Sequence, residues 1–438
     1  MMALHTERGR AMRLLVAIIT VLLLGNLLTF TTKSNRYSES YPAVVCAGNG
    51  SGQTSVIALS SPKTQVRKTG TSTLAYKDSR TRRLAGNNQA TVIDAQEVTP
   101  ISWQVRTGVW AGGLTCLAPV TSQWFVGATA DVTSKGTLSL VNSGLGRALV
   151  GVTLYTEAGV QAEKIFAVKA NSLMTMQLAS LAPGAKSIAI HVKPQTGRVN
   201  AFVTDERGRG LQALGGDTVN SMAAPAKSLV IPAIPQQTGR NSSLPHTLRV
   251  LFPGEVGATI NVVIVSTDGT FSPTGIDGKM IPAGKVVDIP LDVIMKSGKF
   301  ALRLTAERPF VASVFTKTTA LGKSDFLWST AAPELTKSTY SITGMAPLLV
   351  FSGEEIAVDL ELTSIRGSKQ KISIRGEGIS TYQLSDRVRT FEITKNSSAT
   401  FGAALITSKS GFGYAPLFSG STLTRSSIPR SNIRVLIP

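Results

Sequence analysis

Hydrophobic and polar residues alternate in short runs along most of the chain after residue 120. Three stretches repeat one pattern of two alternating runs, an acidic or glycine-containing turn, and two or three further runs: Leu138–Val203, Leu248–Phe315 and Leu348–Ala404. Alternation with a period of two is typical of β-strands that pack one face on a core. The turn glycines Gly159 and Gly269 are separated by about the length of one sandwich domain. We therefore predict an all-β protein of tandem immunoglobulin-like β-sandwiches.

Turn-rich and linker-like segments set the expected domain boundaries. Polar stretches containing Pro and Gly separate the repeats, and short hydrophobic runs interrupted by Ser, Thr, Lys and Arg precede the first of them. We expect this preceding extension to form a partial sheet against the first sandwich. The predicted order is a cytoplasmic N-terminus at 1–13, a transmembrane signal-anchor at 14–32, an extracellular extension with short strands at 33–119, sandwiches at 120–224, 245–332 and 338–418, and a C-terminal tail at 419–438.

The predicted membrane segment is the uncharged apolar run Leu14–Phe30, which follows Arg8, Arg10 and Arg13. Its length reaches the lower limit for spanning a bilayer, and the preceding arginines favour a cytoplasmic N-terminus. The sequence that follows offers no clear cleavage site. We expect a single-pass protein of the cell membrane with an extracellular C-terminal region. A cleaved signal and a secreted protein remain the alternative.

Cys46 and Cys116 are the only two cysteines, and both lie on the side predicted to be exported. Because exported proteins meet an oxidising environment, we predict a disulfide between them. Two unpaired buried thiols are the alternative.

The chain carries a formal net charge of +19, which attracts polyanions in general. Its basic residues are scattered, and no nucleic-acid-binding motif is present, so nucleic acid is not an expected partner. The densest basic run lies in a Ser- and Thr-rich stretch that reads as an exposed loop. We take its residues as candidates for polyanion binding: Lys77, Arg80, Arg82 and Arg83. The alternative is a generally basic, solvated surface.

Aromatic pairs recur near the ends of the repeats. Phe326 and Trp328, and likewise Phe412 and Tyr414, are two positions apart and so share one face of a strand. They are expected to fill the sandwich interiors, with an exposed platform for sugar rings as the alternative.

The adjacent residues Trp124 and Phe125 point to opposite faces of their strand. One of the two should therefore be exposed or covered by the N-terminal segment.

The sequence gives little indication of catalysis. His5, His191 and His246 are isolated, and neither a G-x-S-x-G nor an H-E-x-x-H motif occurs. Carboxylate pairs are the remaining candidates for acid–base chemistry. Asp205-Glu206 and Glu354-Glu355 read as turn residues, and Asp288 points outward from a strand. We predict a protein that is not an enzyme and that has no metal site or cofactor.

Several short motifs make the chain similar to a known family: Cys116–Pro119 with Trp124–Gly127, Leu140–Gly144, Leu154–Gly159, Ile281–Leu291 and Asp325–Trp328. They resemble an uncharacterised actinobacterial family of exported proteins, a domain of unknown function with C-x-x-P…W-F-x-G and D-F-x-W motifs. Ser143 stands where that family usually has proline, and Ala128 where a second glycine is common. The resemblance implies an exported, envelope-associated protein of a Gram-positive actinobacterium, and it implies no activity.

Three functions compete. The leading one is a membrane-anchored extracellular scaffold or interaction protein of the bacterial cell envelope, which supports envelope assembly or a partner envelope protein. The second is a binder of anionic cell-wall polymers or lipid head groups, motivated by the net charge of +19. The third and weakest is an enzyme that modifies a wall polymer.

Overall fold

A computed structural model describes residues 15–21, 43–72, 74–95, 97–236, 245–293, 295, 297–320 and 322–421. Residues 15–21 form a helix with exposed side chains. Among the described residues, no helix has both the length and the apolar character needed to cross a membrane. The rest of the predicted signal-anchor, the predicted cytoplasmic residues 1–13 and His5 lie outside the described residues, as does the C-terminal tail from residue 422.

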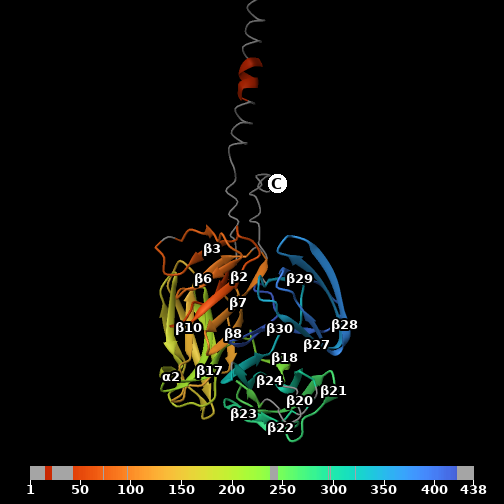
Figure 1. Ribbon diagram of the computed structural model, residues 1–438. Coiled ribbons are helices and arrows are strands. Elements are labelled where there is room, and N and C mark those ends of the chain that lie inside the picture. The colour runs from red at the N-terminus through yellow and green to blue at the C-terminus, as the bar shows by residue number, and fades with distance from the viewer. Residues whose placement is uncertain are drawn as a thin grey trace, which may run out of the picture. The chain divides into compact units, whose positions relative to one another are not determined.

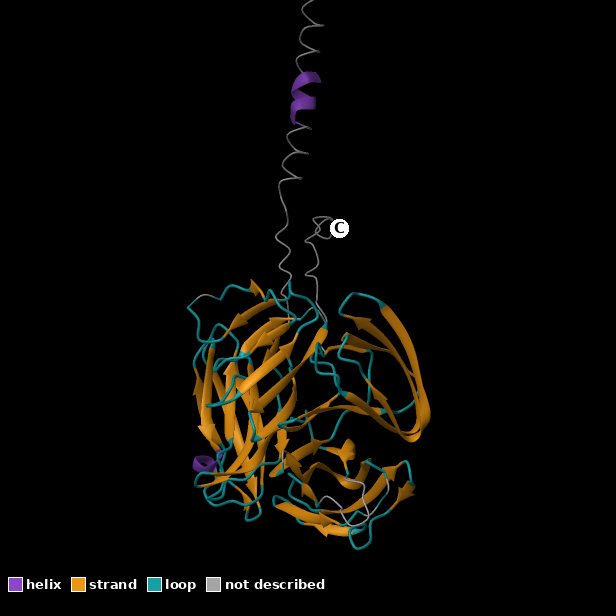
Figure 2. Ribbon diagram, viewed as in Figure 1, coloured by secondary structure: helices purple, strands orange, loops and turns teal. Residues whose placement is uncertain are grey.

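The residues from 43 to 421 belong to one folded body, which is built almost entirely of strands (Figures 1 and 2). Its described part contains one short helix, α2 (Leu178–Leu181). The all-β prediction is thus confirmed. We describe the body as an extension module followed by a first, a second and a third module.

The first module consists of two facing antiparallel sheets. One has the order β14-β10-β16-β17, and its strands are β10 (Thr137–Asn142), β14 (Ser172–Gln177), β16 (Val199–Arg209) and β17 (Gln212–Val219). The other contains β9 (Gln123–Val126), β11 (Ala148–Thr156), β12 (Gly159–Val160), β13 (Lys164–Val168) and β15 (Ile188–Thr196). Alternate residues such as Leu138 and Leu140 from one sheet and Val150 and Val152 from the other meet in a common core, as the sequence pattern predicts.

The second module is organised around one long strand that both of its layers share. The strands are β18 (Ala226–Pro235), β19 (His246–Leu251), β20 (Ala258–Ser266), β21 (Gly269–Phe271), β22 (Lys279–Ile281), β23 (Val286–Leu291), β24 (Lys299–Ala320) and β25 (Lys323–Thr330). The first half of β24 pairs with β18 and β20, and its second half pairs with β19 and β25.

Pro309 lies inside β24, although proline, which has no N–H to donate, is normally confined to the start of a strand or to an edge strand. The pairing of β24 with β20 ends at Ala306, and its pairing with β19 begins at Val311. Pro309 therefore occupies the corner between the two layers, where its missing N–H interrupts neither of these two ladders.

The third module also folds around a long shared strand. Its strands are β26 (Ser338–Ser341), β27 (Leu348–Ser364), β28 (Lys369–Gln383), β29 (Val388–Asn396), β30 (Phe401–Ser408) and β31 (Gly411–Pro416). The start of β27 pairs with β30, its end pairs with β29, and β28 follows it along nearly its whole length. Figure 1 shows the long β27–β28 hairpin as the blue outer edge of this module.

The acidic turns of the first two repeats have the same structural role. The carboxylate of Glu157 accepts hydrogen bonds from the backbone N–H groups of Lys186 (2.9 Å) and Ser187 (3.0 Å). Asp268 in the second repeat accepts one from Ser297 (2.9 Å). In both cases the turn holds the loop that leads into a central strand, which accounts for the acidic residue in the repeated pattern.

The extension module is more fully folded than the sequence indicates. A small sheet has the order β1-β6-β3-β4, with strands β1 (Val44–Cys46), β3 (Gln65–Lys68), β4 (Lys77–Asp78) and β6 (Thr91–Asp94). The strands β2 (Thr54–Ala58), β5 (Arg83–Ala85), β7 (Val98–Arg106) and β8 (Trp110–Thr115) belong instead to the sheet of the third module, because β7 pairs in parallel with β26.

The extension module packs against the first module and pairs with a strand of the third. Val45 and Val92 pack with Val141 and Phe202 of the first module, which agrees with the expected packing. The pairing of β7 with β26 was not foreseen, since no local pattern specifies a partner more than two hundred residues away. This parallel pairing connects the beginning of the folded body to its last module.

We predict that replacing both Cys46 and Cys116 by alanine lowers the free energy of unfolding. The two cysteines form a disulfide across a sequence separation of 70, and closing a loop of that length stabilises a protein by about 4 kcal/mol in the chain-entropy description. Urea denaturation followed by tryptophan fluorescence measures the difference. The wild-type protein under reducing conditions should approach the variant, whereas equal midpoints for the oxidised wild type and the variant would contradict the prediction.

Candidate functional site

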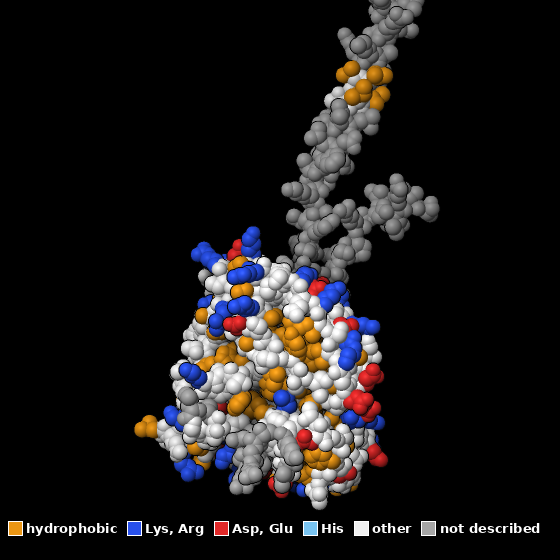
Figure 3. Space-filling view, turned by 45° about the vertical axis from the view of Figure 1, so that its right-hand side comes forward, with side chains coloured by type: hydrophobic (Ala, Val, Ile, Leu, Met, Phe, Trp, Pro, Cys, Tyr) orange, Lys and Arg blue, Asp and Glu red, His pale blue; other side chains and the backbone are white. Residues whose placement is uncertain are grey.

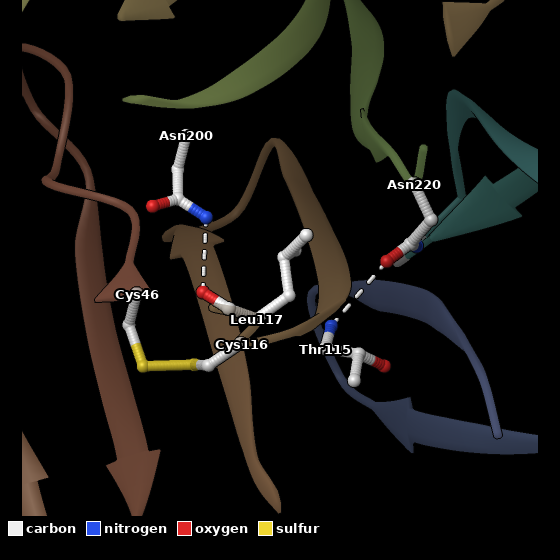
Figure 4. Close-up of a disulfide and its surroundings, with 6 residues drawn as sticks. All are labelled: Cys46, Thr115, Cys116, Leu117, Asn200 and Asn220. Atoms are coloured by element: carbon white, nitrogen blue, oxygen red, sulfur yellow. Dashed lines mark hydrogen bonds between the residues drawn. A yellow bond between two sulfur atoms is a disulfide. The ribbon is translucent and has the colours of Figure 1, made fainter. Parts of the chain in front are cut away.

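The disulfide between Cys46 and Cys116 is present, as predicted, and both residues are fully buried. Cys46 ends β1, and Cys116 directly follows β8, so the bond joins the two sheets of the extension module. The next residue, Leu117, exchanges backbone hydrogen bonds with Val45, and its carbonyl accepts a hydrogen bond from the Asn200 side chain (3.0 Å) (Figure 4). The disulfide therefore fixes a segment that also anchors the first module.

Four strands, one from each module, form what we call the central junction: β8, β17, β25 and β31. They pack in a cycle in which β8 contacts β17 and β31, and β25 contacts the same two strands. In Figure 1, β8 lies near the middle of the folded body. The central junction is the place where side chains from all four modules meet.

Glycine allows these strands to approach each other closely. A Cβ atom on Gly113 would lie 3.1 Å from the carbonyl oxygen of Tyr414, and one on Gly216 would lie 2.8 Å from the indole ring of Trp110. A Cβ atom on Gly413 would come within 2.5 Å of the backbone nitrogen of Gly113. Side chains at these positions would force the strands apart.

Polar side chains connect all four modules across the central junction. The Asn220 amide donates to the carbonyl oxygens of Gly113 (3.0 Å) and Tyr414 (2.8 Å), and its oxygen accepts from the backbone of Thr115 (3.3 Å) (Figure 4). The Tyr414 hydroxyl donates to the carbonyl oxygen of Thr330 (2.6 Å) in the second module. Buried backbone groups that no sheet partner reaches are thus satisfied by side chains of a neighbouring module.

Two buried aspartates form reciprocal bonds between the first and second modules. Asp217 of β17 accepts from the backbone N–H of Trp328 (2.7 Å), and Asp325 of β25 accepts from that of Gly216 (3.1 Å). A third buried carboxylate, Asp205, accepts from the Trp328 indole (2.9 Å) and pairs with Arg207 (2.7 Å). The sequence suggested a turn at Asp205-Glu206, but both residues lie inside β16 and are buried.

Burial changes the acidity of these groups. It raises the pKa of Asp325 to about 7, and it raises the pKa of Asp217 well above its usual value, with further contributions from the nearby charges of Asp325 and Asp205. One oxygen of Asp325 has no hydrogen-bond partner among the described residues. No group of His, Cys, Asp and Glu in the described part of the chain is arranged to hold a metal ion.

The predicted aromatic residues lie in cores and junctions. Phe326 and Trp328 belong to the second module, yet they are buried in the core of the first. Tyr414 is fully buried where the second and third modules meet, and Phe412 packs partly against the same cluster. Phe326 and Trp328 thus complete the core of a module other than their own, and Tyr414 fills the space between two modules.

Trp124 and Phe125 are both buried, each in a different core. Phe125 lies in the core of the first module, whereas Trp124 belongs to the core cluster of the second module and stacks on His191 at 3.9 Å between ring centroids. The sequence indicated that one of the pair is exposed or covered by the N-terminal segment. The second module provides the cover instead.

Arg249 of β19 is buried and joins the first and second modules through a set of hydrogen bonds. Its guanidinium donates to Asp288 (2.7 and 2.9 Å) and, in the first module, to the carbonyl of Ala128 (2.5 Å) and the hydroxyl of Ser187 (3.1 Å). It also lies over the ring of Trp328, with the guanidinium carbon 4.9 Å from the ring centroid. Asp288, considered above as a candidate acid, is thus the counter-ion of a structural arginine.

The remaining candidates for acid–base chemistry are separated from one another. Glu354 and Glu355 are exposed on β27, and Glu354 pairs with Arg303. His246 is buried against Thr316 and Gln236, and His191 is half-buried beside Ser122. Burial lowers the pKa of each histidine to about 4. The described residues bring none of these side chains together into a catalytic arrangement.

The four basic candidates of the extension module are divided between its two sheets. Lys77 lies on β4 in the small sheet, and Arg83 lies on β5 in the other. Lys77, Arg80 and Arg83 are exposed, whereas Arg82 is half-buried. In Figure 3, several Lys and Arg side chains gather at the upper left of the folded body. The sequence did not indicate that Arg82 lies near Arg389 of the third module, whose pKa is lowered by burial and then by the charge of Arg82.

Replacing Arg249 by methionine should lower the free energy of unfolding by about 3 kcal/mol, because Asp288 loses its counter-ion and the Ala128 carbonyl loses its donor. Arg249→Lys should recover only part of the loss, since an ammonium group cannot contact both modules in the same forked geometry. Chemical denaturation measures both effects. Arg308→Met, at an exposed position, is the matched control; a loss of the same size there would contradict the assignment.

Asp325 should make the protein less stable as the pH rises. Its folded-state pKa is about 7 and its ordinary value is 3.8, so the folded state binds more protons between these values. The contribution of Asp325 to stability is therefore fully present below about pH 4, falls as the pH rises to 7 and is constant above. His191 and His246, with lowered pKa values, act in the opposite direction between about pH 4 and their ordinary 6.5.

The difference in the free energy of unfolding between a variant and the wild type isolates the pH dependence that is due to Asp325. The free energy of unfolding of Asp325→Asn, relative to wild type, should rise by about 3 kcal/mol between pH 5 and pH 8, because only the wild type loses stability through this group. Urea denaturation at a series of pH values measures the difference. The exposed Asp386→Asn serves as the control and should show none; a constant difference for Asp325→Asn would show that the residue is not protonated in the folded protein.

Comparisons with known proteins give one clear relationship. No curated protein shows significant similarity to the chain. Among solved structures, one titled "Crystal Structure of Thermotoga maritima 1070" matches 23% of this chain and 93% of its own, with 14% sequence identity and a TM-score of 0.21. The "Family of unknown function (DUF5719)" matches residues 75–374, which run from the extension module through the first and second modules into β28 of the third. Because this match spans more than half of the sequence, the chain belongs to that family.

Proposed function

We propose that the protein is a membrane-anchored extracellular scaffold or interaction protein of the bacterial cell envelope, built from immunoglobulin-like β-sandwiches and without a catalytic role. Its origin would be an actinobacterium, as the resemblance of its motifs implies. The observation that carries the proposal is the central junction, where one strand from every module meets its neighbours through buried hydrogen bonds. Such a junction holds four modules in one fixed arrangement, which suits the presentation of surfaces to a partner.

Two further observations support this function. The buried Cys46–Cys116 disulfide suits an exported protein, because disulfides persist in oxidising compartments. In addition, the carboxylates that could have served an enzyme have structural partners: Asp205 pairs with Arg207, and Asp288 pairs with Arg249. A residue that holds modules together is poorly suited to exchange protons with a substrate.

A binder of anionic polymers or lipid head groups is the second candidate. The net charge of +19 favours it, as do the exposed basic side chains Lys77, Arg80 and Arg83 of the extension module.

Fractionation of cells tests the proposed membrane anchor and extracellular location. The full chain should sediment with membranes and resist extraction by alkaline carbonate, and its two cysteines, probed in the denatured protein, should react with a thiol reagent only after a reductant has been added. Quantitative cross-linking in native membranes should then yield a defined envelope protein in constant stoichiometry. Cysteines that are labelled without a reductant, or a chain that is soluble inside the cell, would rule out the membrane-anchored extracellular location. A chain that cross-links to no envelope protein would rule out the scaffold function.

A further inference from the structure

Arg82 and Arg389 come from distant parts of the chain. They lie near each other where the extension module packs against the third module, at a place separate from the central junction. Backbone hydrogen bonds fix their positions. The carbonyl of Arg82 accepts from Leu59 (2.8 Å), and that of Arg389 accepts from Ile342 (3.0 Å). The hydroxyl of Thr343 donates to the carbonyl of Leu59 (3.1 Å) and thereby connects the two segments.

The two arginines lack the partners that such groups usually have. In the described structure, the Nε atoms of both side chains are buried and have no hydrogen-bond partner. Neither side chain takes part in an ion pair formed by the described residues. Half-buried arginines are normally accompanied by a carboxylate, because a desolvated charge is costly without one.

Arg82 and Arg389 are also close enough to repel each other. The pKa of the Arg389 guanidinium is lowered, first by burial and then by the positive charge of Arg82. The acidic residues nearest to Arg389 in sequence are Asp386 and Glu392: Asp386 is exposed and accepts a hydrogen bond from the neighbouring Ser385, and Glu392 pairs with Lys337. The fold therefore holds two like charges together without a protein anion between them.

A third arginine borders the same place. The side chain of Arg83 lies over the backbone at Gly344, where an added Cβ atom would be 3.1 Å from its Cδ atom. Gly344 has a φ of +74°, which suits glycine and leaves room for this arginine. We call Arg82 and Arg389, together with the neighbouring Arg83, the arginine cluster; it gathers positive charge and N–H donors where the extension module meets the third module.

We propose that the arginine cluster binds a phosphate group. Guanidinium groups donate pairs of parallel hydrogen bonds to oxyanions, and the several oxygens of a phosphate can accept from two guanidinium groups at once. A bound phosphate would offset the repulsion between Arg82 and Arg389, because its negative charge would lie beside both guanidinium groups. The phosphate can come from a lipid head group or from a phosphodiester polymer of the envelope, so this inference deepens the second candidate function.

Thermal unfolding of the full-length protein in detergent tests the site with inorganic phosphate as the probe. Phosphate, compared with chloride at matched ionic strength, should raise the midpoint of the wild-type protein in a saturable manner. Arg82→Gln and Arg389→Gln should each weaken the apparent affinity for phosphate at least about tenfold. Arg209→Gln, an exposed arginine of the first module, is the matched control and should respond like the wild type.

The same variants separate a binding role from a structural one. Without phosphate, Arg82→Gln and Arg389→Gln should unfold at the wild-type temperature or above it, because each removes an uncompensated charge. If either variant unfolds markedly earlier without phosphate, its arginine is a structural residue and the inference fails. An equal response to phosphate in the wild type and in the Arg82→Gln/Arg389→Gln double variant would also overturn it.

Two further binding experiments, which form the two arms of this test, identify the source of the phosphate. The wild type and the double variant are compared for binding to phosphatidylglycerol vesicles against phosphatidylcholine vesicles, and to soluble poly(glycerol phosphate). Because both proteins carry the same N-terminal segment, any difference between them reports on the arginine cluster. If inorganic phosphate binds at the cluster and neither arm distinguishes the two proteins, the site stands and the second candidate function fails.

Discussion

The close approach of four strands at the central junction is the constraint on which the rest of the structure depends. At Gly113, Gly216 and Gly413 there is no room for a side chain, so backbone from one module lies directly against backbone or an aromatic ring of another. Strands packed in this way cannot all complete their hydrogen bonds within their own sheets. Asn220, Asp217, Asp325 and Tyr414 therefore provide the missing partners across module boundaries.

Because of this constraint, neighbouring modules share their hydrophobic cores and are not separate domains. The aromatic side chains of β25 complete the core of the first module, and Trp124 of the first module joins the core of the second. Arg249 adds a buried polar contact between the same two modules. Loss of one module would expose hydrophobic surface and unpaired polar groups in its neighbour, so we expect the folded body to unfold cooperatively.

The candidate catalytic residues show how far chemistry can be inferred from sequence. Asp205, Asp288 and the histidines belong to residue types that catalyse reactions, but their surroundings in the fold give them structural partners. The basic run of the extension module was visible in the sequence as a source of charge. Its most informative property, the meeting of Arg82 with Arg389, depends on β5 and β29 lying in one sheet system, which no local pattern indicates.

The sequence by itself determined the properties that arise from nearby residues. Alternation predicted the strands of the first module, the acidic turns marked the repeats, and two cysteines in a chain expected to be exported predicted their disulfide. Only the tertiary structure decided that β7 pairs with β26, that Pro309 lies at the corner of a shared strand, and which core encloses Trp124 and Trp328. The physical reason is that strand periodicity reports which face of a strand is buried, whereas the partner that buries it is selected by packing over the whole chain.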